Sequence, residues 1–441
     1  MASTSLTRTP SSNGSTTINT WSFWVKRTDL NDYETLYSSE ISSSNVFKIG
    51  FTLNALEILF YVAPSYVFQI KTNRLFRDTS AWYHIVVTQN AGAATNTDRL
   101  KIYVNGVQET SFAITNFPDL DEGAAPINAS GVLQNIGTTA TEYFGGSMSH
   151  IHLCDGTAYD ATAFGEYDAN GVWKIKTDVS VTYGTNGFFI LKDGNSVTDQ
   201  SGNSNNWTVA GGTLTKTEDS PSNVFATWNK IDGKTSSSTF SNGNLKTVSA
   251  ANSPNICGTS TLGASQGKYY YEIKLTTEAV SGEAFMGVGG DMETNIDSDP
   301  RNEVPYYAIR NQGGIIQTGV SQSTSQHPNF SAGDIIGFGL DLDNNRLYIS
   351  KNGSWWDSTT TFSGSTPTNY ITLGTGFSHW RVMVANVGGA SSQETYEANF
   401  GNGYFGTTAV STPGTNASGN GIFEFDVPTG YTALSTKGLN L

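Results

Sequence analysis

The sequence predicts an all-β protein in which two antiparallel β-sandwich domains follow one another in tandem. Two segments far apart, 101–107 and 346–356, each carry a strand-forming run, then Asn-Gly, then further β-branched or aromatic residues. Asn and Gly tolerate the positive φ of a tight turn, so Asn-Gly between such runs is the strongest short-range hairpin signal. Another strand-like run precedes each hairpin, at 82–88 and at 335–342. This repeated design indicates two β-domains.

Composition favours the same fold class. The chain has 441 residues, of which 47 are glycine, 12% are aromatic and only 14% are charged. Helical proteins carry more Ala, Leu, Glu and Lys, and no segment offers a convincing helix of several turns. The length suggests about two or three domains.

Charge and cysteine content exclude several classes of function. A net charge of −14 argues against nucleic-acid binding, which needs clustered Lys and Arg. Two cysteines, Cys154 and Cys257, exclude a disulfide scaffold and a cysteine-based zinc site. The N-terminus shows no apolar secretory segment, and the most apolar stretch, 55–63, is about half the length of a membrane span. We therefore expect a soluble, unprocessed chain without membrane insertion.

Strand-like runs succeed one another through the first half. In the run 21–25, Trp21, Phe23 and Val25 share one face, as in a sandwich with an apolar inner face. Further strands are expected at 46–53, 58–62, 66–70, 82–88, 100–104 and 148–153.

The second half repeats the pattern from residue 268 onward. In the run 268–275, alternate residues from Tyr269 to Leu275 share one face, whereas Glu272 and Lys274 are expected to face water. The last run, 421–428, is strand-like and stops at a proline. Further strands are expected at 285–289, 335–342, 346–350, 380–386 and 396–400.

Particular motifs connect the two halves to known families. The first half carries WYHIVVT at 82–88, YVNG at 103–106, IG at 136–137 and FGGSM at 144–148. With these motifs, residues 15–176 resemble the LamG-like jelly rolls of the concanavalin A-like lectin/glucanase superfamily. The second half carries GKYYYE at 267–272, GDIIGF at 333–338, LYISKNG at 347–353 and NFG at 399–401. With these, residues 225–441 resemble a SPRY domain, so the resemblance implies two concanavalin A-like sandwiches.

The junction and the two ends carry a further set of motifs. They are FGE at 164–166, GVW at 171–173, YGTNGF at 183–188, DSPSNVFAT at 219–227, TRTPS at 7–11 and VPTGYTAL at 427–434. Together they resemble tailed-bacteriophage virion proteins, especially of marine phages, that join these two modules. The resemblance implies a place on a phage particle and does not distinguish the head from the tail.

These observations divide the chain into four segments. We predict an N-terminal arm at 1–14, the LamG-like domain at 15–176, a connector at 177–224 and the SPRY-like domain at 225–441. The connector is rich in Gly, Asn and Ser, but its aromatic residues indicate that it packs partly on the first domain, because free linkers rarely carry them.

No residue is assigned a catalytic role. The G-x-S-x-G motif at 263–267 precedes a strand, whereas a nucleophile elbow leads into a helix. Glucanases of the superfamily place three carboxylates on one strand as E-x-D-x-x-E, and paired acids are needed for that chemistry. The nearest run has Glu166 and Asp168, but it has Gly171 at the third position and is expected to lie outside a hairpin.

Two groups of side chains are considered as metal sites. His150 and His152 are expected on the same face of one strand, but two strand histidines without a third ligand are typically structural. Asp119, Asp121 and Glu122 lie in one acidic loop. Calcium prefers about six to eight oxygen ligands, and LamG-like domains often hold a calcium ion at the sandwich rim. The resemblance thus makes this loop a candidate calcium site; a solvated acidic loop without a metal is the simpler interpretation. No other cofactor is expected.

The ligand-binding candidates lie in the SPRY-like half. SPRY domains bind partners with loops at one end of the sandwich, which implies contacts in the polar loop 291–305 and after the second Asn-Gly turn. Core packing of one of two adjacent tryptophans is the alternative, because successive strand residues face opposite ways. The candidate contact residues are Asp299, Arg301, Tyr306, Trp355 and Trp356.

The function expected from these observations is non-enzymatic. We expect a virion surface protein, a decoration or fibre on head or tail, that attaches the phage to a host-surface glycan or protein. It would be made in the bacterial cytoplasm, contact other virion proteins, and occur as a homo-oligomer or in several copies, so that avidity strengthens weak single contacts. Two alternatives are a glycan-cleaving depolymerase and a purely architectural capsid decoration protein.

Overall fold

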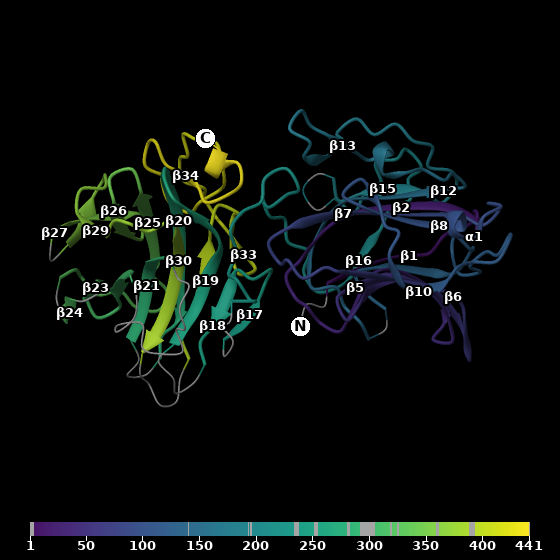
Figure 1. Cartoon of the computed structure of the whole chain (residues 1–441). Helices are drawn as coiled ribbons and strands as arrows, with labels where there is room; N and C mark the ends of the chain where they lie inside the picture. Colours follow the sequence, from purple (N-terminus) through teal and green to yellow (C-terminus); the bar gives the residue numbers. More distant parts are fainter. Residues whose placement is uncertain are drawn as a thin grey trace. The chain divides into compact units, whose positions relative to one another are not determined.

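The computed structural model of this chain forms two compact units, unit 1 (Met1–Lys216) and unit 2 (Thr217–Leu441) (Figure 1). The structure describes residues 4–440 except 140, 193, 195, 233–237, 251–254, 280–282, 292–304, 318–319, 324–325, 359–360 and 388–392.

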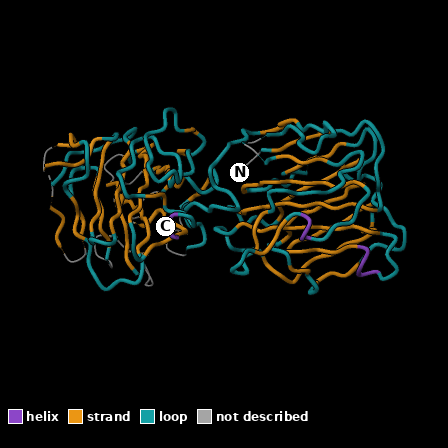
Figure 2. Tube along the Cα trace, turned by 90° about the horizontal axis from the view of Figure 1, so that it is seen from above, coloured by secondary structure: helices purple, strands orange, loops and turns teal. Residues whose placement is uncertain are grey.

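Both units are built almost entirely from antiparallel sheets, which confirms the predicted tandem β-sandwich fold. Figure 2 shows strands and loops almost throughout, with only short helical turns. The α-helix α1 (Asn96–Arg99) has four residues. Over the described residues, the structure holds no helix with the length and apolarity needed to cross a membrane.

Unit 1 contains an eight-stranded sheet, a six-stranded sheet and a small hairpin. The eight-stranded sheet has the order β10-β6-β5-β4-β3-β11-β1-β16, the six-stranded sheet has the order β15-β12-β2-β7-β8-β9, and β13 pairs with β14. The strands are β1 (Ser5–Arg8), β2 (Ile18–Arg27), β3 (Tyr33–Ser42), β4 (Asn45–Thr52), β5 (Ala55–Val62), β6 (Ser65–Leu75), β7 (Trp82–Asn90), β8 (Leu100–Val104), β9 (Val107–Gln108), β10 (Phe112–Asn116), β11 (Leu133–Ile136), β12 (Gly146–Asp155), β13 (Gly165–Tyr167), β14 (Trp173–Ile175), β15 (Phe188–Ile190) and β16 (Thr208–Gly211), with the 3-10 turn η1 (Ala161–Ala163).

The core of unit 1 lies between its two large sheets. Trp21, Phe23 and Val25 of β2 are completely buried in it, as their shared face predicts. The 177–224 segment supplies edge strands to both sheets, since β15 pairs with β12 and β16 pairs with β1. Phe188 and Trp207 of this segment are buried in the same core. The N-terminal β1 lies between β11 and β16 in the eight-stranded sheet.

Unit 2 has a ten-stranded sheet and a six-stranded sheet. The larger sheet follows β17-β18-β31-β20-β25-β26-β27-β28, with β29 on β26 and β34 on β20; the smaller follows β19-β30-β21-β22-β23-β24, and β32 pairs with β33. The strands are β17 (Thr239–Ser241), β18 (Lys246–Val248), β19 (Asn255–Ala264), β20 (Lys268–Thr277), β21 (Glu283–Gly290), β22 (Tyr306–Arg310), β23 (Ile315–Gln317), β24 (Val320–Ser323), β25 (Ile335–Asp341), β26 (Arg346–Lys351), β27 (Ser354–Ser358), β28 (Thr361–Gly364), β29 (Tyr370–Thr372), β30 (Trp380–Val387), β31 (Thr395–Asn399), β32 (Tyr404–Phe405), β33 (Thr408–Ala409) and β34 (Thr432–Ala433), followed by the 3-10 turn η3 (Gly438–Asn440).

The C-terminal part of unit 2 differs from the strand expected at 421–428. Residues 411–434, named the strap here, run mostly as irregular backbone that doubles back on itself, with a bond from Gly414 N–H to the Phe423 carbonyl. Phe423 and Tyr431 of the strap pack on Tyr270 and Trp355 in a buried aromatic cluster. These two residues belong to β20 and β27, and Figure 1 shows the yellow C-terminal segment beside β20. The strap therefore covers the part of the ten-stranded sheet's outward face around Tyr270 and Trp355.

Glu272 is buried rather than facing water, which corrects the expectation for the run 268–275. Both of its carboxylate oxygens accept hydrogen bonds: Oε1 from Tyr270 Oη (3.1 Å) and Phe425 N (2.9 Å), Oε2 from Asn399 Nδ2 (3.2 Å) and Glu424 N (2.9 Å). Burial raises the pKa of Glu272 to about 7, although the hydrogen bonds act in the opposite direction. Alternation correctly predicts which residues of this strand face the core, but it carries no information on the strap that covers the opposite face.

Candidate functional site

The eight-stranded sheet of unit 1 has an outward face opposite its core. Phe47 and Ile49 of β4 are buried in the core, so Lys48 between them points outward. Phe60 of β5 is also a core residue, and its neighbour Tyr61 therefore points outward. This face is the setting of the candidate site.

A β-bulge brings Tyr66 to the same outward face. Phe68 and Ile70 of β6 point into the core, and simple alternation would send Tyr66 inward with them. The register shifts after Phe60, which pairs with Phe68, so that Tyr61 pairs with Tyr66. Residues directly opposite one another lie on the same side of a sheet, and the two tyrosine rings are 5.2 Å apart between centroids. The exposed fraction of Tyr66 is 49%.

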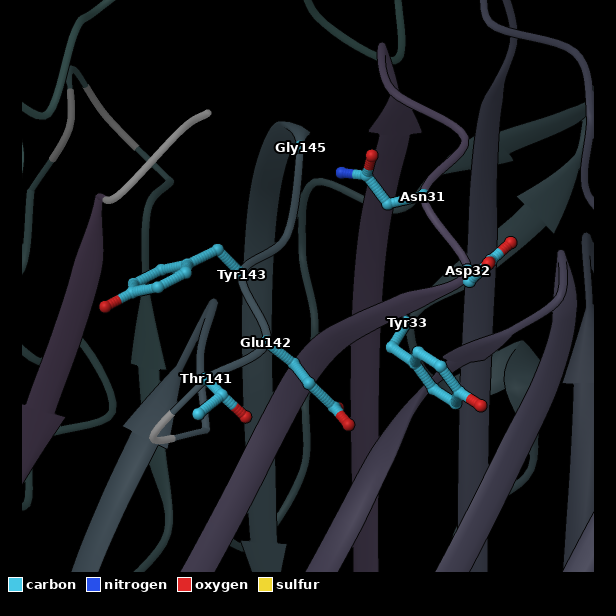
Figure 3. Close-up of a pocket in the computed structure, with 7 residues that line it drawn as sticks. All are labelled: Asn31, Asp32, Tyr33, Thr141, Glu142, Tyr143 and Gly145. Atoms are coloured by element: carbon cyan, nitrogen blue, oxygen red, sulfur yellow. The ribbon is translucent and has the colours of Figure 1, made fainter.

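Two hollows open on this face and together are named the outer groove. The first has a volume of about 380 Å³, and Figure 3 shows its lining residues on two segments, 31–33 and 141–145. The second has a volume of about 560 Å³. Thr141 and Glu142 line both hollows. The first is lined by Asn31, Asp32, Tyr33, Thr141, Glu142, Tyr143 and Gly145, and the second includes Glu40, Lys48, Leu59, Tyr61, Pro64 and Tyr66.

Glu142 ties the loop between the hollows to the sheet. Its Oε2 lies 2.9 Å from Lys48 Nζ on β4 and accepts a hydrogen bond of 3.0 Å from Thr35 Oγ1 on β3. Lys48 and Glu142 are both largely buried, so solvent and salt screen this pair less than an exposed one. The shared wall of the outer groove is thus held in place by a charge pair.

A buried ion pair supports the floor of the first hollow. Gly145 N–H donates to Glu34 Oε1 at 3.1 Å, and Glu34 Oε2 lies 2.6 Å from Arg27 Nη2 with both side chains fully buried. A Cβ at position 145 would come within 2.6 Å of the Asp29 Cβ, so only glycine fits there. Removing one partner of a buried pair costs about 3–5 kcal/mol, so this floor depends on both Arg27 and Glu34.

The outer groove offers phenol rings, hydroxyls, an amide and carboxylates. Tyr33 has an exposed fraction of 53% and stands at the start of β3. Burial, followed by Coulombic repulsion from Glu57, Tyr61, Tyr33 and Glu142, raises the pKa of Tyr66. The phenol therefore stays neutral at physiological pH and can donate or accept hydrogen bonds. Such a surface suits a ligand rich in hydroxyl groups.

The ligand contacts predicted in unit 2 are buried where the structure describes them, and they stay a prediction. Trp356 is buried in the main core, and Trp355 is buried on the opposite face beneath the strap. Tyr306 is buried in a further apolar cluster with Phe285. The two tryptophans lie on opposite faces of β27, but neither is exposed, because both faces of this strand are covered. Asp299 and Arg301 lie outside the described residues.

The predicted calcium loop is stabilised by one hydrogen bond within the loop and by another to Ala91 outside it. Asp119 N–H donates to Glu122 Oε2 at 2.9 Å, and Asp121 N–H donates to the Ala91 carbonyl at 2.9 Å. In the part of the chain that the structure describes, no three His, Cys, Asp or Glu side chains are grouped so as to hold a metal ion. Calcium binding here stays a prediction without geometric support.

The two strand histidines of β12 have structural surroundings. The register of β12 shifts between Ser149 and His152, and His150 adopts a positive φ of 47°, so the regular alternation expected there is interrupted. His152 is buried, its ring stacks on Phe189 with centroids 3.9 Å apart, and its Nδ1 lies 2.9 Å from Tyr183 Oη. Burial lowers the pKa of His152 well below its ordinary value.

The acidic run 166–171 lies in a hairpin, contrary to expectation. Glu166 is part of β13, which pairs with β14. In the turn between these strands, the Asp168 carboxylate accepts a backbone hydrogen bond and lies 2.6 Å from Lys174 Nζ. This hairpin is separate from both large sheets. The G-x-S-x-G segment forms the end of β19 and, at 265–267, the turn that leads into β20, so a strand follows it as expected.

The outer groove itself was not predicted from sequence. The runs 58–62 and 66–70 were expected as strands, and alternation in the first of them already places Tyr61 opposite the core residues. No comparable sequence pattern predicts the bulge that turns Tyr66 or the loop that brings Glu142 to the sheet.

Comparison with known proteins identifies two domains. Residues 2–162 match the model of the concanavalin A-like lectin/glucanases superfamily, and residues 268–388 match the model of the SPRY domain. No curated protein matches the chain.

Solved structures resemble parts of the chain at low identity. The SPRY domain of human HERC1 is 15% identical, with a TM-score of 0.27, over 35% of this chain and 86% of that one. A SAP-like pentraxin from Limulus polyphemus is 16% identical, with a TM-score of 0.27, over 35% and 71% of the two chains. Domain 4 of the arabinanase AbnA from Geobacillus stearothermophilus, solved with arabinotriose, is 21% identical, with a TM-score of 0.25, over 34% and 64%. Likeness at this level says nothing about ligands of this chain.

Proposed function

We propose that this protein is a non-enzymatic attachment protein on the surface of a tailed-bacteriophage virion, which binds a host-surface glycan through the outer groove of unit 1. The observation that carries the binding role is the open groove with half-exposed Tyr33 and Tyr66. Aromatic rings pack on the apolar faces of sugar rings, while neighbouring hydroxyl, amide and carboxylate groups bind sugar hydroxyls.

A binding role is favoured over cleavage by the state of the groove's central acid. Glycoside hydrolysis needs one carboxylic acid that protonates the leaving group and a second that attacks or activates water. Glu142 is instead engaged by Lys48 and Thr35. The acids of the nearest glucanase-like run, Glu166 and Asp168, lie on the separate β13–β14 hairpin.

The virion setting rests on the junction motifs, such as 183–188 and 219–227, that resemble those of phage virion proteins. On a particle the protein would contact other virion proteins and be present in several copies. Many copies convert a weak single-site affinity into firm attachment, because later contacts form at high effective concentration.

The test is binding of the full chain to arrayed bacterial polysaccharides, followed by calorimetric titration of those that bind. We expect Tyr33→Ala and Tyr66→Ala each to weaken binding about three- to tenfold, the range that a lost aromatic contact represents. Tyr167→Ala is the matched control, since Tyr167 is also 53% exposed but lies on the β13–β14 hairpin away from the groove.

Each competing function has its own readout. If reducing ends accumulate during incubation with polysaccharide, the result would favour depolymerisation over attachment as the function. A blank array, together with fragile particles when the protein is missing, would favour an architectural role. Virions that carry no label when stained for this chain would overturn the phage assignment.

A further inference from the structure

The two hollows of the outer groove adjoin each other. They share Thr141 and Glu142 as lining residues. This shared wall is fixed to the sheet by Lys48 and Thr35. A ligand that occupies both hollows therefore crosses a preformed wall.

The pairing of β4 with its two neighbouring strands gives an estimate of the length of the outer groove. Tyr33 pairs with Thr52 of β4, and Tyr61 pairs with Val46, six residues back along the same strand. A strand rises by roughly 3.3 Å per residue, so the two tyrosines are offset by about 20 Å along the strand direction. That distance exceeds the size of a single sugar ring.

Each end of the groove carries an aromatic platform. Tyr33 stands at one end, and the Tyr61–Tyr66 pair stands at the other, with a row Glu40, Val46, Tyr61 and Tyr66 running across four neighbouring strands. Two separated stacking positions are what a polymer needs and what a single terminal sugar does not use.

The charges of the groove select against acidic polymers. Three lining carboxylates, Asp32, Glu40 and Glu142, stand against one ammonium, Lys48, which is paired with Glu142. Glu57 and Glu142 also contribute to raising the pKa of Tyr66, second to burial. Like charges repel across such a surface, and the whole chain carries −14.

We propose that the outer groove binds an internal stretch of an uncharged polysaccharide, with Tyr33 and the Tyr61–Tyr66 pair stacking on separate sugar units of one chain. This inference rests on the proposed function, of which it names the ligand class.

The test is calorimetric titration of the full chain with β-linked manno-, galacto- and gluco-oligosaccharides from disaccharide to octasaccharide, and with the matching uronates. We expect affinity to rise with length for a neutral series and then to level off. Both Tyr33→Ala and Tyr66→Ala weaken octasaccharide binding about three- to tenfold, whereas only one of them weakens disaccharide binding. Tyr167→Ala changes neither.

A charge variant supplies an independent arm of the experiment. Asp32→Asn combined with Glu40→Gln is expected to increase affinity for the uronates, and more so at low ionic strength, where charges are screened less. Length-independent binding, or wild-type preference for uronates, overturns this inference and leaves glycan attachment standing. Failure of every arrayed and titrated glycan to bind overturns the proposed function together with it.

Discussion

The two units treat the outward faces of their larger sheets differently. In unit 1 the face over β3–β6 stays open and forms the outer groove. In unit 2 the strap covers the corresponding side of the ten-stranded sheet, so that Tyr270, Tyr348 and Trp355 are buried. Aromatic residues stand on both outward faces, but the strap buries these three, whereas Tyr33 and Tyr66 of unit 1 are half exposed. Tyr370 on β29, which pairs with Tyr348, keeps an exposed fraction of 38%. The comparison teaches that exposure is set by the covering segment and not by the strand that carries the ring.

The largest effect is expected from the covered face. Trp355→Ala and Trp356→Ala should each lower the free energy of unfolding of unit 2 by about 3–5 kcal/mol, because each leaves a cavity in a buried cluster. Urea unfolding followed by circular dichroism measures both. A loss for Trp355→Ala below about 1 kcal/mol would mean that the strap does not bury this residue in solution, since surface substitutions fall in that range.

The attachment of the strap gives the next effect. Glu272→Ala removes the carboxylate that accepts hydrogen bonds from the backbone N–H groups of Glu424 and Phe425 and from the side-chain amide of Asn399. These three donors are then left without this acceptor. Each unsatisfied buried group costs about 1–3 kcal/mol, and we expect faster hydrogen exchange of strap amides before global unfolding. Glu397→Ala, a largely buried carboxylate on β31 that lies 3.8 Å from Lys246, serves as the comparison. Equal exchange in both variants would contradict the role of Glu272.

Stability should depend on pH through the same carboxyl group. Its pKa is raised from 4.5 to about 7 in the folded state, so folding favours the protonated acid. The contribution is complete below a pH of about 4.5 and is lost as the pH rises to about 7, and it amounts to roughly 3 kcal/mol. The measurement is the free energy of unfolding in urea across this pH range, for the wild type and for Glu272→Gln. The difference between the two isolates the contribution of this carboxyl group. A flat difference would show that the strap's hydrogen bonds keep Glu272 ionised throughout.

The smallest effect on stability is expected from the open face. Tyr33→Ala and Tyr66→Ala should change the free energy of unfolding of unit 1 by less than about 0.5 kcal/mol, because both side chains are half exposed. Thermal and urea unfolding measure this change, and the same preparations serve the binding titrations. A loss comparable with that of Trp355→Ala would mean that these rings are structural and that the groove is not free.

Alternation in the sequence predicted the inner faces of the sandwiches well. Trp21, Phe23 and Val25 are buried together in unit 1, and Tyr271 and Ile273 are buried in the main core of unit 2. The period of two along a strand decides which residues share a face, and this property is local. The candidate site was much less predictable, because Tyr66 reaches it through a bulge and Glu142 through a loop.

The sequence by itself determined the all-β class, the positions of most strands and the side chains that point into each sandwich. Only the tertiary structure decided which outward faces remain open. Glu272 is covered by amides of residues 424 and 425, more than a hundred positions away, whereas the face that carries Tyr66 has no such cover over the outer groove among the residues that the structure describes. Side-chain direction follows from neighbouring residues along a strand, but burial of the second face depends on a segment whose docking is a long-range packing event that no local pattern encodes.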